Sequence, residues 1–576
     1  MEKNKLYYGD NLEIIRRYIK DESVDLIYLD PPFKSDQDYN VLFAEHNGTH
    51  SAAQIKAFED TWHWDQTAAE AWQNVVEMDG KVSQAMQAFR TFLGENDMLA
   101  YLSMMAPRLI ELRRVLKDTG SIYLHCDPTA SHYLKMLMDA IFRPQNFKNE
   151  IIWRRTGAHN ARRIFGPIHD SILFYCKKDE YYFNIVKHPY MKGHVERRYK
   201  KGSDGIYKFT SGGNVLTGAG ATSGESGAKW RGFDPSAKKR HWAIPGFLTE
   251  QMPVEFQKLG VLDKLEALYK AGLVEIKEGC AWPTPVRYLD EDGQPLQDIW
   301  SYQPYTEGTV YGTNEGIDGD IAWLGPTDPE RLGYQTQKPV GILERIIESS
   351  CPNDGVVLDP FCGCGTTIAA AQKLNRKWEG IDITHLAISL VRNRLRDMFG
   401  NQVNYEIVGE PKDLSGAKTL AKEDPWQFQW WALGYVGARP VEQKKGADKG
   451  IDGRLYFHDE GPGGKTKQII FSVKSGHVSV RDIRDLRGTV EREKAEIGVL
   501  ITMEEPTKPM RTEAASAGFY KSPGWDKNYP KMQVLTIEEI LNGKGIDCPP
   551  LQQTNITFKK AGKAKGKGDK QTELGF

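Results

Sequence analysis

The fold is decided by the stretch Val356-Val357-Leu358-Asp359-Pro360-Phe361-Cys362-Gly363-Cys364-Gly365-Thr366-Thr367. Here an apolar strand runs into a turn that carries two glycines, and Ile368–Gln372 continues as a helix. Glycine lets the backbone approach a ligand closely, and a helix N-terminus presents unpaired N–H groups. The strand Trp378–Ile383 follows, and its acid, Asp382, lies 17 residues beyond Gly365, where an acid can accept hydrogen bonds from two ribose hydroxyls. The pattern predicts a nucleotide-type cofactor site in a Rossmann-like α/β sheet.

A second motif, Asp30-Pro31-Pro32-Phe33, ends the run Ser23–Leu29, which is typical of a buried strand. Two prolines fix φ and remove two backbone donors, so the chain leaves the sheet in a stiff turn. This turn would hold a carboxylate, a free carbonyl and an aromatic ring around one small pocket. An exocyclic amino group on a planar base needs two acceptors and a stacking partner. Attack on a methyl sulfonium also needs the nitrogen lone pair directed at the carbon, so positioning is most of the catalysis.

The two motifs together resemble those of amino-methylating DNA methyltransferases. Asp-Pro-Pro-Phe at residues 30–33 has the form typical of adenine-N6 enzymes, and residues 361–365 resemble their S-adenosylmethionine loop. The catalytic motif precedes the cofactor motif, which resembles the β class, to which type III modification subunits belong. Thr336-Gln337-Lys338-Pro339 with the helix after it, and Tyr8–Leu12, match two further motifs of that class. The resemblance covers residues 1 to about 400.

This resemblance implies a methyltransferase that takes a flipped adenine from double-stranded DNA and S-adenosylmethionine as cofactor. Lys338 would meet the cofactor carboxylate, and Asp382 would bind its ribose. The implied catalytic residues are Asp30, Pro31, Pro32 and Phe33. The implied cofactor-binding residues are Asp10, Asp359, Phe361, Gly363, Gly365, Thr366, Asp382 and Lys338.

Three other functions remain open at this point. N4-cytosine methyltransferases share the mechanism, but they usually begin the motif with Ser where this chain has Asp30. A methyltransferase acting on RNA or protein is a second alternative. A non-catalytic DNA-binding or defence-complex subunit is the third, and undetectable cofactor binding would favour it.

A local excess of basic residues marks the region 151–240, which carries 18 Lys and Arg against 7 Asp and Glu, while the whole chain has a net charge of -1. Basic residues interleaved with aromatic ones suit phosphate contact and base stacking. We therefore predict a target-recognition and DNA-binding insert over 151–330. The predicted phosphate-binding residues are Arg154, Arg155, Arg162, Arg163, Arg197, Arg198, Lys200 and Lys201, and the aromatic residues among them are Trp153, His159, Tyr199, Trp230 and Trp242.

A further unit is predicted over 424–545. Asp452 in a turn, followed by a strand ending in Ser472-Val473-Lys474, resembles the two-metal nuclease pattern of Mrr-like restriction-endonuclease domains. In that family Glu or Gln stands where this chain has Ser472, and Ser is a poor metal ligand. Two interpretations stay open: a fused methyltransferase-endonuclease that cuts DNA with Mg²⁺ held by Asp452, and a DNA-clamping or partner-binding remnant. Glu491 or Glu493 is the alternative source of a displaced carboxylate.

Composition and length set the remaining limits. The chain has 576 residues, 40% hydrophobic and 27% charged, which is typical of an ordinary globular protein with several domains. Seven cysteines without paired zinc spacing predict reduced thiols and a cytoplasmic, nucleoid-associated protein. Apolar spacing predicts a helix over 98–117, and the pattern over 121–127 predicts a buried strand. Related enzymes often dimerise, so a homodimer and a restriction or defence partner subunit are the expected assemblies. The predicted domains are 1–150 and 331–410 for the two methyltransferase halves, 151–330 for the insert, 424–545 for the endonuclease-like domain and 546–576 for a basic flexible tail.

Overall fold

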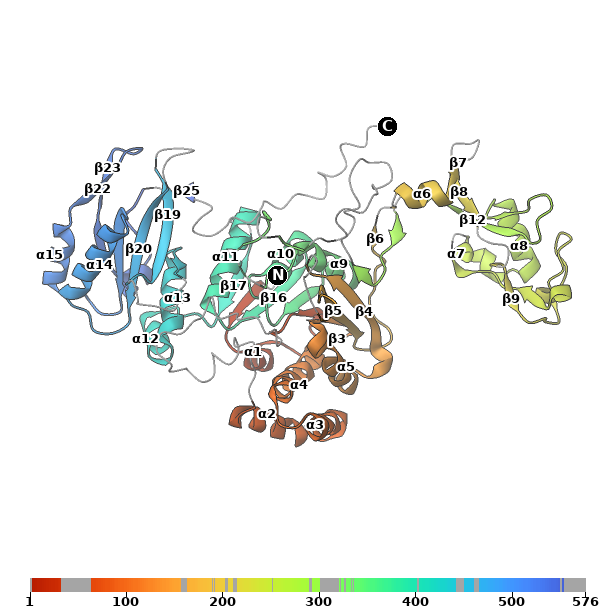
Figure 1. Ribbon diagram of the computed structural model, residues 1–576, viewed down its shortest axis with the longest axis horizontal. Helices are drawn as coiled ribbons and strands as arrows, with labels where there is room; N and C mark the ends of the chain where they lie inside the picture. The colour runs from red at the N-terminus through yellow and green to blue at the C-terminus, as the bar shows by residue number, and fades with distance from the viewer. Residues whose placement is uncertain are drawn as a thin grey trace. The chain divides into compact units, whose positions relative to one another are not determined.

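A computed structural model describes residues 3–32, 64–156, 163–188, 190, 192–201, 206–210, 215–250, 252–289, 293–300, 321, 323–325, 328–332, 334, 336–400, 403–441, 450–459, 466–549 and 552–553 (Figure 1). The chain divides into two compact units. Unit 1 contains residues 1–184, 298–301 and 321–576, and unit 2 contains residues 185–297 and 302–320. No helix of the described residues is long and apolar enough to cross a membrane.

The centre of unit 1 is a nine-stranded sheet in the order β14-β4-β5-β3-β2-β15-β16-β1-β17. The strands from β3 through β2, β15, β16 and β1 to β17 are parallel, and β5 runs antiparallel to both β3 and β4. This arrangement confirms the predicted Rossmann-like α/β class. The strands are β1 (Asn4–Tyr8), β2 (Val24–Leu29), β3 (Leu116–Cys126), β4 (Phe147–Arg154), β5 (His169–Cys176), β14 (Ile299–Trp300), β15 (Val356–Asp359), β16 (Lys377–Asp382) and β17 (Tyr405–Val408).

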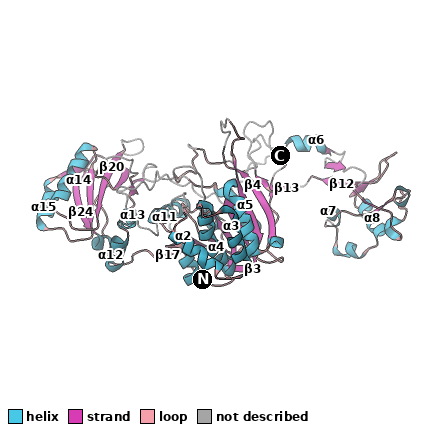
Figure 2. Ribbon diagram, turned by 60° about the horizontal axis from the view of Figure 1, so that its bottom comes forward, coloured by secondary structure: helices cyan, strands magenta, loops and turns pink. Residues whose placement is uncertain are grey.

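Helices cover both faces of this sheet, and those of one face lie together in Figure 2. On that face the side chains of Tyr7, Ile27 and Leu358 join one hydrophobic core with the helices. On the other face Ile368 of α10 packs against Gly380. The first group is α1 (Asn11–Tyr18), α4 (Asp97–Val115) and α5 (Pro128–Phe142), with α2 (Gln66–Val76) and α3 (Gly80–Leu93) packed against α4 and α5; the second is α9 (Val340–Ser350), α10 (Thr366–Lys373) and α11 (His385–Phe399).

The neighbouring strands β2 and β15 are the feature of the sheet that matters for function. All six residues of β2 are buried, as expected for a central parallel strand that is covered on both faces. Leu358 of β15 pairs with Ile27 of β2, so both strands end at the same edge of the sheet. Strand order reverses between them, and in open α/β sheets ligands bind at such a switch point, outside the carboxyl ends of the strands.

Unit 2 has a small sheet in the order β11-β12-β8-β7 and a separate core of aromatic and aliphatic side chains. It begins at Ile185, so the insert predicted from residue 151 is wider than this unit. The reason is that β4 and β5 hydrogen-bond into the central sheet. Its elements are β6 (Lys187–His188), α6 (Lys192–Arg198), β7 (Lys200–Lys201), β8 (Tyr207–Thr210), β9 (Thr217–Ala219), β10 (Arg240–Trp242), α7 (Gly246–Thr249), α8 (Val261–Lys270), β11 (Val274–Glu275), β12 (Thr284–Tyr288) and β13 (Gln294–Pro295).

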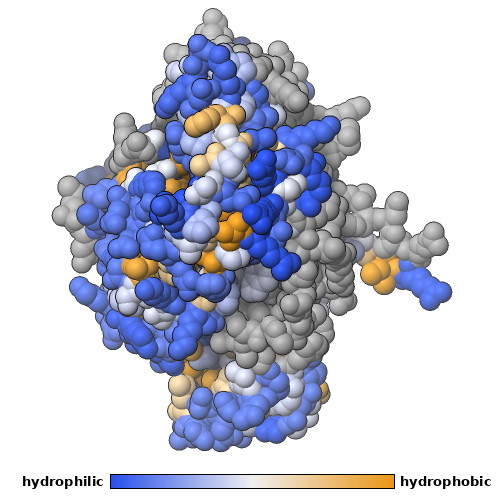
Figure 3. All heavy atoms as spheres, turned by 90° about the vertical axis from the view of Figure 1, so that its left-hand side faces the viewer, coloured by the Kyte–Doolittle hydropathy of each residue, from blue (hydrophilic) through white to orange (hydrophobic). Residues whose placement is uncertain are grey.

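The C-terminal part of unit 1 is a second α/β domain with strand order β18-β19-β20-β21-β24. Its sheet separates two hydrophobic cores, so helices pack on both faces. Figure 3 views the side that carries α14 and α15 and shows a mainly hydrophilic surface with small separate hydrophobic patches. The elements are α12 (Leu414–Glu423), α13 (Pro425–Tyr435), β18 (Arg439–Pro440), β19 (Gly453–His458), β20 (Lys467–Lys474), α14 (Val480–Arg492), β21 (Ile497–Thr502), α15 (Lys508–Ser516), β22 (Phe519–Ser522), β23 (Lys527–Pro530), β24 (Met532–Thr536), α16 (Ile537–Leu541) and β25 (Gln552–Gln553). The predicted tail over 546–576 lies mostly outside the described residues.

Candidate active site

Two motifs that are more than 300 residues apart in sequence meet at the carboxyl edge of β2 and β15. Asp30 follows the last residue of β2, and Asp359 is the last residue of β15. The pairing of Leu358 with Ile27 brings these ends together. Pro31 is buried and Pro32 half-buried. The stacking ring expected from Phe33 lies outside the described residues.

The glycine loop after β15 has the conformation that its sequence predicts. Gly363 and Gly365 have φ values of +49° and +75°, which are accessible to glycine at little cost. The N–H of Phe361 donates to Oδ1 of Asp359 at 3.0 Å, and the N–H of Gly363 donates to Oδ2 of Asp382 at 2.9 Å. The two carboxylates predicted near the cofactor therefore hold the loop in shape.

Burial dominates the protonation of both carboxyls. It raises the pKa of Asp359 to about 7, although hydrogen bonds from Thr367 and Phe361 oppose the rise. It also raises the pKa of Asp382 to about 6, against hydrogen bonds from Thr384 and Gly363. The negative charge of Asp30 adds to the rise at Asp359. Several acidic groups thus share one low-dielectric edge, where a cationic ligand group would be favoured.

The first turn of α10 is open to a ligand. Gly365 is its N-cap and provides no side-chain hydrogen bond, so the cap leaves helix N–H groups at the loop. Thr366, a predicted cofactor residue, accepts a hydrogen bond at Oγ1 from Nη1 of Arg394, at 3.0 Å. Arg394 is buried in α11 and also donates to the carbonyl of Cys364 at 3.3 Å. Arg394 was not identified from the sequence, and no local pattern marks it.

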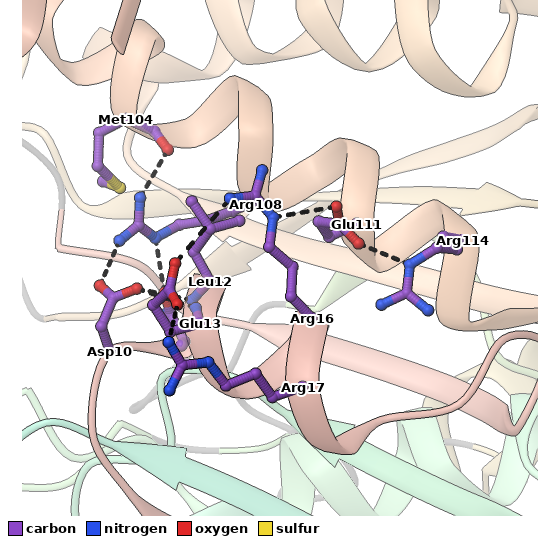
Figure 4. Close-up of polar contacts among 10 residues, drawn as sticks. Asp10, Leu12, Glu13, Arg16, Arg17, Met104, Arg108, Glu111 and Arg114 are labelled. Carbon is purple, nitrogen blue, oxygen red and sulfur yellow. Dashed lines mark hydrogen bonds and ion pairs between the residues drawn. The ribbon is translucent and has the colours of Figure 1, made fainter. Parts of the chain in front are cut away.

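Asp10 caps α1 and is held by an arginine (Figure 4). Its Oδ1 accepts from the N–H groups of Leu12 and Glu13, and its Oδ2 accepts from Nη2 of Arg108 at 2.7 Å. Nε of Arg108 donates to Oδ1 of Asn11 at 2.6 Å, and Nδ2 of Asn11 donates to the carbonyl of Pro360 at 2.8 Å. Asp10 therefore supports the cofactor loop through this chain of contacts, and direct contact with the cofactor stays a prediction.

Arg108 is the second residue that the sequence-based prediction missed. Its side chain is 14% exposed, and burial lowers its pKa while Asp10 opposes that effect. A signal was available: Arg108 lies within α4, whose buried positions are mostly apolar. A charged residue among them is rarely buried without a partner.

Lys338 lies beside Asp30, the carboxylate predicted to be catalytic. Its Nζ donates to Oδ2 of Asp30 and lies 3.4 Å from the carbonyl of Thr336. The prediction that Lys338 binds the cofactor carboxylate is not tested by this contact, but the contact gives the residue a second candidate role.

A buried polar network lies behind the catalytic strand. The hydroxyl of Tyr28 is 2.8 Å from Nδ1 of His125, and Nε2 of His125 is 3.1 Å from Oδ2 of Asp170. All three side chains are buried. His125 is thus a core histidine with both nitrogens partnered, as its position at the end of a buried strand indicates.

The predicted DNA-binding residues separate into two groups. Arg155 lies 3.3 Å from Asp170, and Nε of Arg154 donates to the carbonyl of Thr156, so both are tied to the central sheet. A second set is exposed: Arg163, Arg197, Arg198, Lys200 and Lys201. Arg162 lies outside the described residues.

The predicted base-stacking role of the aromatic residues in this region is wrong for four of them. Trp153, Tyr199, Trp230 and Trp242 are all buried, and at most 8% of each is exposed. Trp230 and Trp242 belong to the core of unit 2. His159 lies outside the described residues.

The nuclease-like residues are in the C-terminal domain, and the described residues form no metal cage around them. Oδ2 of Asp452 accepts from Oγ of Ser472 at 3.2 Å and from the N–H of Val473 at 2.7 Å. Among the described residues no group of three His, Cys, Asp or Glu could hold a metal ion. Glu493 is paired with Arg454 at 2.7 Å instead of joining Asp452. Glu491 is likewise paired, with an arginine of its own helix at 3.2 Å. Lys474 is exposed.

Comparison with known proteins places these sites in families. A family model described as DNA methylase matches residues 24–393, and one described as NACHT-associated inactive Restriction Endonuclease 1 matches residues 426–542. The Type II methyltransferase M.EcaI of Enterobacter cloacae is 26% identical over 407 residues, which cover 70% of this chain and 72% of that protein. The Mod subunit of the Type III restriction-modification enzyme StyLTI from Salmonella typhimurium is 26% identical over 413 residues, which cover 71% of this chain and 55% of that protein.

The chain thus spans 72% of the first relative and about half of the second. A solved putative DNA modification methylase from Thermus thermophilus, complexed with S-adenosyl-L-methionine, aligns with 70% of this chain and 98% of its own at 14% identity. Its TM-score of 0.31 is too low to support an argument. The family match, by contrast, runs from β2 into α11 and includes both motifs of the switch point. This chain belongs to the DNA methylase family.

Proposed function

We propose that this chain is a site-specific DNA methyltransferase that transfers a methyl group from S-adenosylmethionine to N6 of adenine in double-stranded DNA. One observation carries the proposal: β2 and β15 pair, so Asp30 and the glycine loop open onto one edge of the sheet. A methyl donor on the loop and an amino group at Asp30 would be neighbours there. Placing two reactants side by side is the main requirement of this reaction.

The residues of the loop fit S-adenosylmethionine. Gly363 and Gly365 bring the backbone close, and the uncapped first turn of α10 offers N–H donors to a carboxylate. Asp382, at the end of the next strand, can receive ribose hydroxyls. When bound, this cofactor supplies an electrophilic methyl group on a positively charged sulfur.

The catalytic motif would orient the nucleophile. Asp30 and the carbonyl of Pro31 accept hydrogen bonds from the two N6 hydrogens. These hydrogen bonds direct the nitrogen lone pair at the methyl carbon. As the N–C bond forms and the S–C bond breaks, N6 gains positive charge and releases one proton, which the Asp30 carboxylate or water takes up. Stacking by Phe33 is part of the proposal. Asp rather than Ser at position 30 favours adenine over cytosine.

Duplex DNA is the proposed substrate, with the target base flipped out of the helix. The exposed arginines and lysines of residues 163–201 support phosphate contact. The StyLTI relative is named as a subunit of a restriction-modification enzyme, so we extend that context to this chain, with a restriction or defence subunit and a homodimer as proposed assemblies.

The C-terminal domain is proposed as a non-cleaving domain that needs no Mg²⁺. The hydrogen bonds from Ser472 and Val473 support this, because both are donated to Oδ2 of Asp452 and engage that carboxylate within the domain. The matched family is also described as inactive.

Purified protein, tritiated S-adenosylmethionine and unmethylated genomic DNA test the proposal. We expect N6-methyladenine in the nucleoside digest by mass spectrometry, and its loss in Asp30→Ala. N4-methylcytosine would move the target to the other base. No labelled base with the wild-type protein would refute the stand-alone methyltransferase.

A further inference from the structure

Lys338 joins the two halves of the methylase sheet at the site of chemistry. It precedes α9, yet its Nζ donates to Oδ2 of Asp30, 308 residues away in the sequence. Both side chains are largely buried, 13% and 16% exposed. In such surroundings an ion pair is screened less than on the surface, so its geometry is better defined.

The segment that carries Lys338 is braced on both sides. Oε1 of Gln337 accepts from the N–H of Leu332 at 2.7 Å, and Nε2 of Gln337 donates to the carbonyl of Glu330 at 2.8 Å. On the other side the N–H of Val340, the first residue of α9, donates to Oε1 of Glu330 at 2.7 Å. The backbone at Lys338 is therefore fixed before the side chain reaches across to β2.

A second carboxylate helps to keep the ammonium in place. Burial alone would raise the pKa of Asp170, but the hydrogen bond and charge of His125, with the charges of Lys338 and Arg155, lower it. Asp170 is thus ionised within electrostatic reach of Lys338. An ammonium that contacts Asp30 and also interacts electrostatically with Asp170 gains from both charges, which disfavours its release.

The contact gives the two oxygens of the Asp30 carboxylate different roles. Oδ2 is occupied by Lys338, and among the described residues no other group bonds to Asp30. Oδ1 therefore remains as an acceptor. Resting on the proposed function, we propose that Lys338 is a positioning residue, which anchors Oδ2 of Asp30 so that Oδ1 points at the amino group of the target base.

Loss of Lys338 should have a different effect if the residue positions Asp30 than if it binds the cofactor. Without the ammonium the carboxylate can turn about its χ2 bond, and the amino group loses its fixed acceptor. The rate of methyl transfer should then fall while cofactor affinity stays. A lysine that bound the cofactor carboxylate would give the reverse.

The test compares Lys338→Met and Lys338→Arg with wild type. Under single-turnover conditions with saturating cofactor and DNA, we expect Lys338→Met to slow transfer by about 100-fold, the size of a misplaced reacting group. The dissociation constant for S-adenosylmethionine, from titration calorimetry, should change by less than about threefold. Lys338→Arg should recover part of the rate. Lys373→Met is the matched control, since it removes a lysine–carboxylate pair between α9 and α10 (Lys373–Glu344, 2.6 Å).

A background of Asp30→Asn keeps the test decisive if Lys338→Met folds poorly. A neutral amide needs no ammonium, so adding Lys338→Met or Lys338→Arg to Asp30→Asn should change the remaining rate by less than about threefold. An undiminished effect in that background would overturn the proposal. A wild-type rate of methyl transfer in Lys338→Met at saturating cofactor and DNA would also overturn the proposal, whether or not cofactor binding is weaker. A wild-type protein that labels no base refutes the proposed function itself, which separates the two failures.

Discussion

Replacing Gly365 with Ala perturbs the cofactor loop at its tightest point. Gly365 has a φ of +75° and is the N-cap of α10. A Cβ at this position would lie 2.8 Å from Cγ2 and 3.2 Å from Cγ1 of Val391 on α11. The substitution therefore meets a backbone obstacle and a steric one, and the two can be separated.

The magnitude follows from these two costs. A left-handed conformation costs an Ala about 1–2 kcal/mol more than a Gly. Overpacking against Val391 adds about 1–3 kcal/mol. If the loop must keep its native shape to bind S-adenosylmethionine, the sum of about 2–5 kcal/mol weakens binding by roughly 30- to 5,000-fold.

Titration calorimetry with S-adenosylmethionine measures the effect. Adding Val391→Ala to Gly365→Ala removes both γ carbons and should restore affinity to within roughly 30-fold of Val391→Ala alone, since the backbone cost remains and Cβ of residue 391 stays at 3.3 Å. Gly94→Ala is a control, because Gly94 also has a positive φ, +71°, and its Cβ would meet open space at the end of α3. Wild-type affinity in a folded Gly365→Ala variant would refute the reasoning.

Three further results are expected. Asp359 is protonated in the folded protein up to about pH 7 and ionised in the unfolded chain above about pH 4, so the stability of the protein falls as pH rises through that window. Asp359→Asn should reduce this fall, by roughly 4 kcal/mol at most. A melting temperature that keeps its full pH dependence in the variant would contradict the prediction. The double variant Arg197→Ala, Arg198→Ala should weaken DNA binding without lowering the melting temperature. Each lost phosphate contact should reduce the slope of the logarithm of the DNA-binding constant against the logarithm of salt concentration by about 0.9. An unchanged slope would show that these residues do not contact DNA. Wild-type protein should leave plasmid DNA intact in the presence of Mg²⁺. Ser472→Glu adds a carboxylate beside Asp452 and should gain measurable Mn²⁺ affinity. Cleavage by the wild-type protein would show that the serine does not silence the domain.

Local patterns predicted the parts of the fold that local forces determine. The apolar run before Asp30 became β2 (Val24–Leu29), and the helix expected over 98–117 became α4 (Asp97–Val115). The glycine loop also has the positive φ values that its sequence implies. In each case hydrophobic periodicity or glycine chemistry acts over a few residues, so a single sequence is sufficient.

Contacts between distant segments were beyond that reach. Nothing near Lys338 or Asp30 in the sequence indicates that they touch, because their contact depends on β2 pairing with β15. Strand pairing likewise places β4 and β5 in the central sheet, which the prediction of an insert starting at residue 151 did not anticipate. Trp230 and Trp242 carried a compositional signal for DNA contact, yet burial of their large apolar area decided their position.

The way in which the chain enters and leaves unit 2 has a consequence for how such a protein diversifies. Strands β6 and β13 pair antiparallel, with Lys187 beside Pro295, so the ends of the excursion are already joined. Closing a longer excursion costs only about 0.6 kcal/mol for each doubling of its length. The segment between β6 and β13 can therefore become longer or shorter, or be replaced by another, without strain on the strands that carry Asp30 and Asp359. Because target recognition is a proposed role of this insert, we expect new sequence preferences to arise in unit 2 while the proposed chemistry stays unchanged.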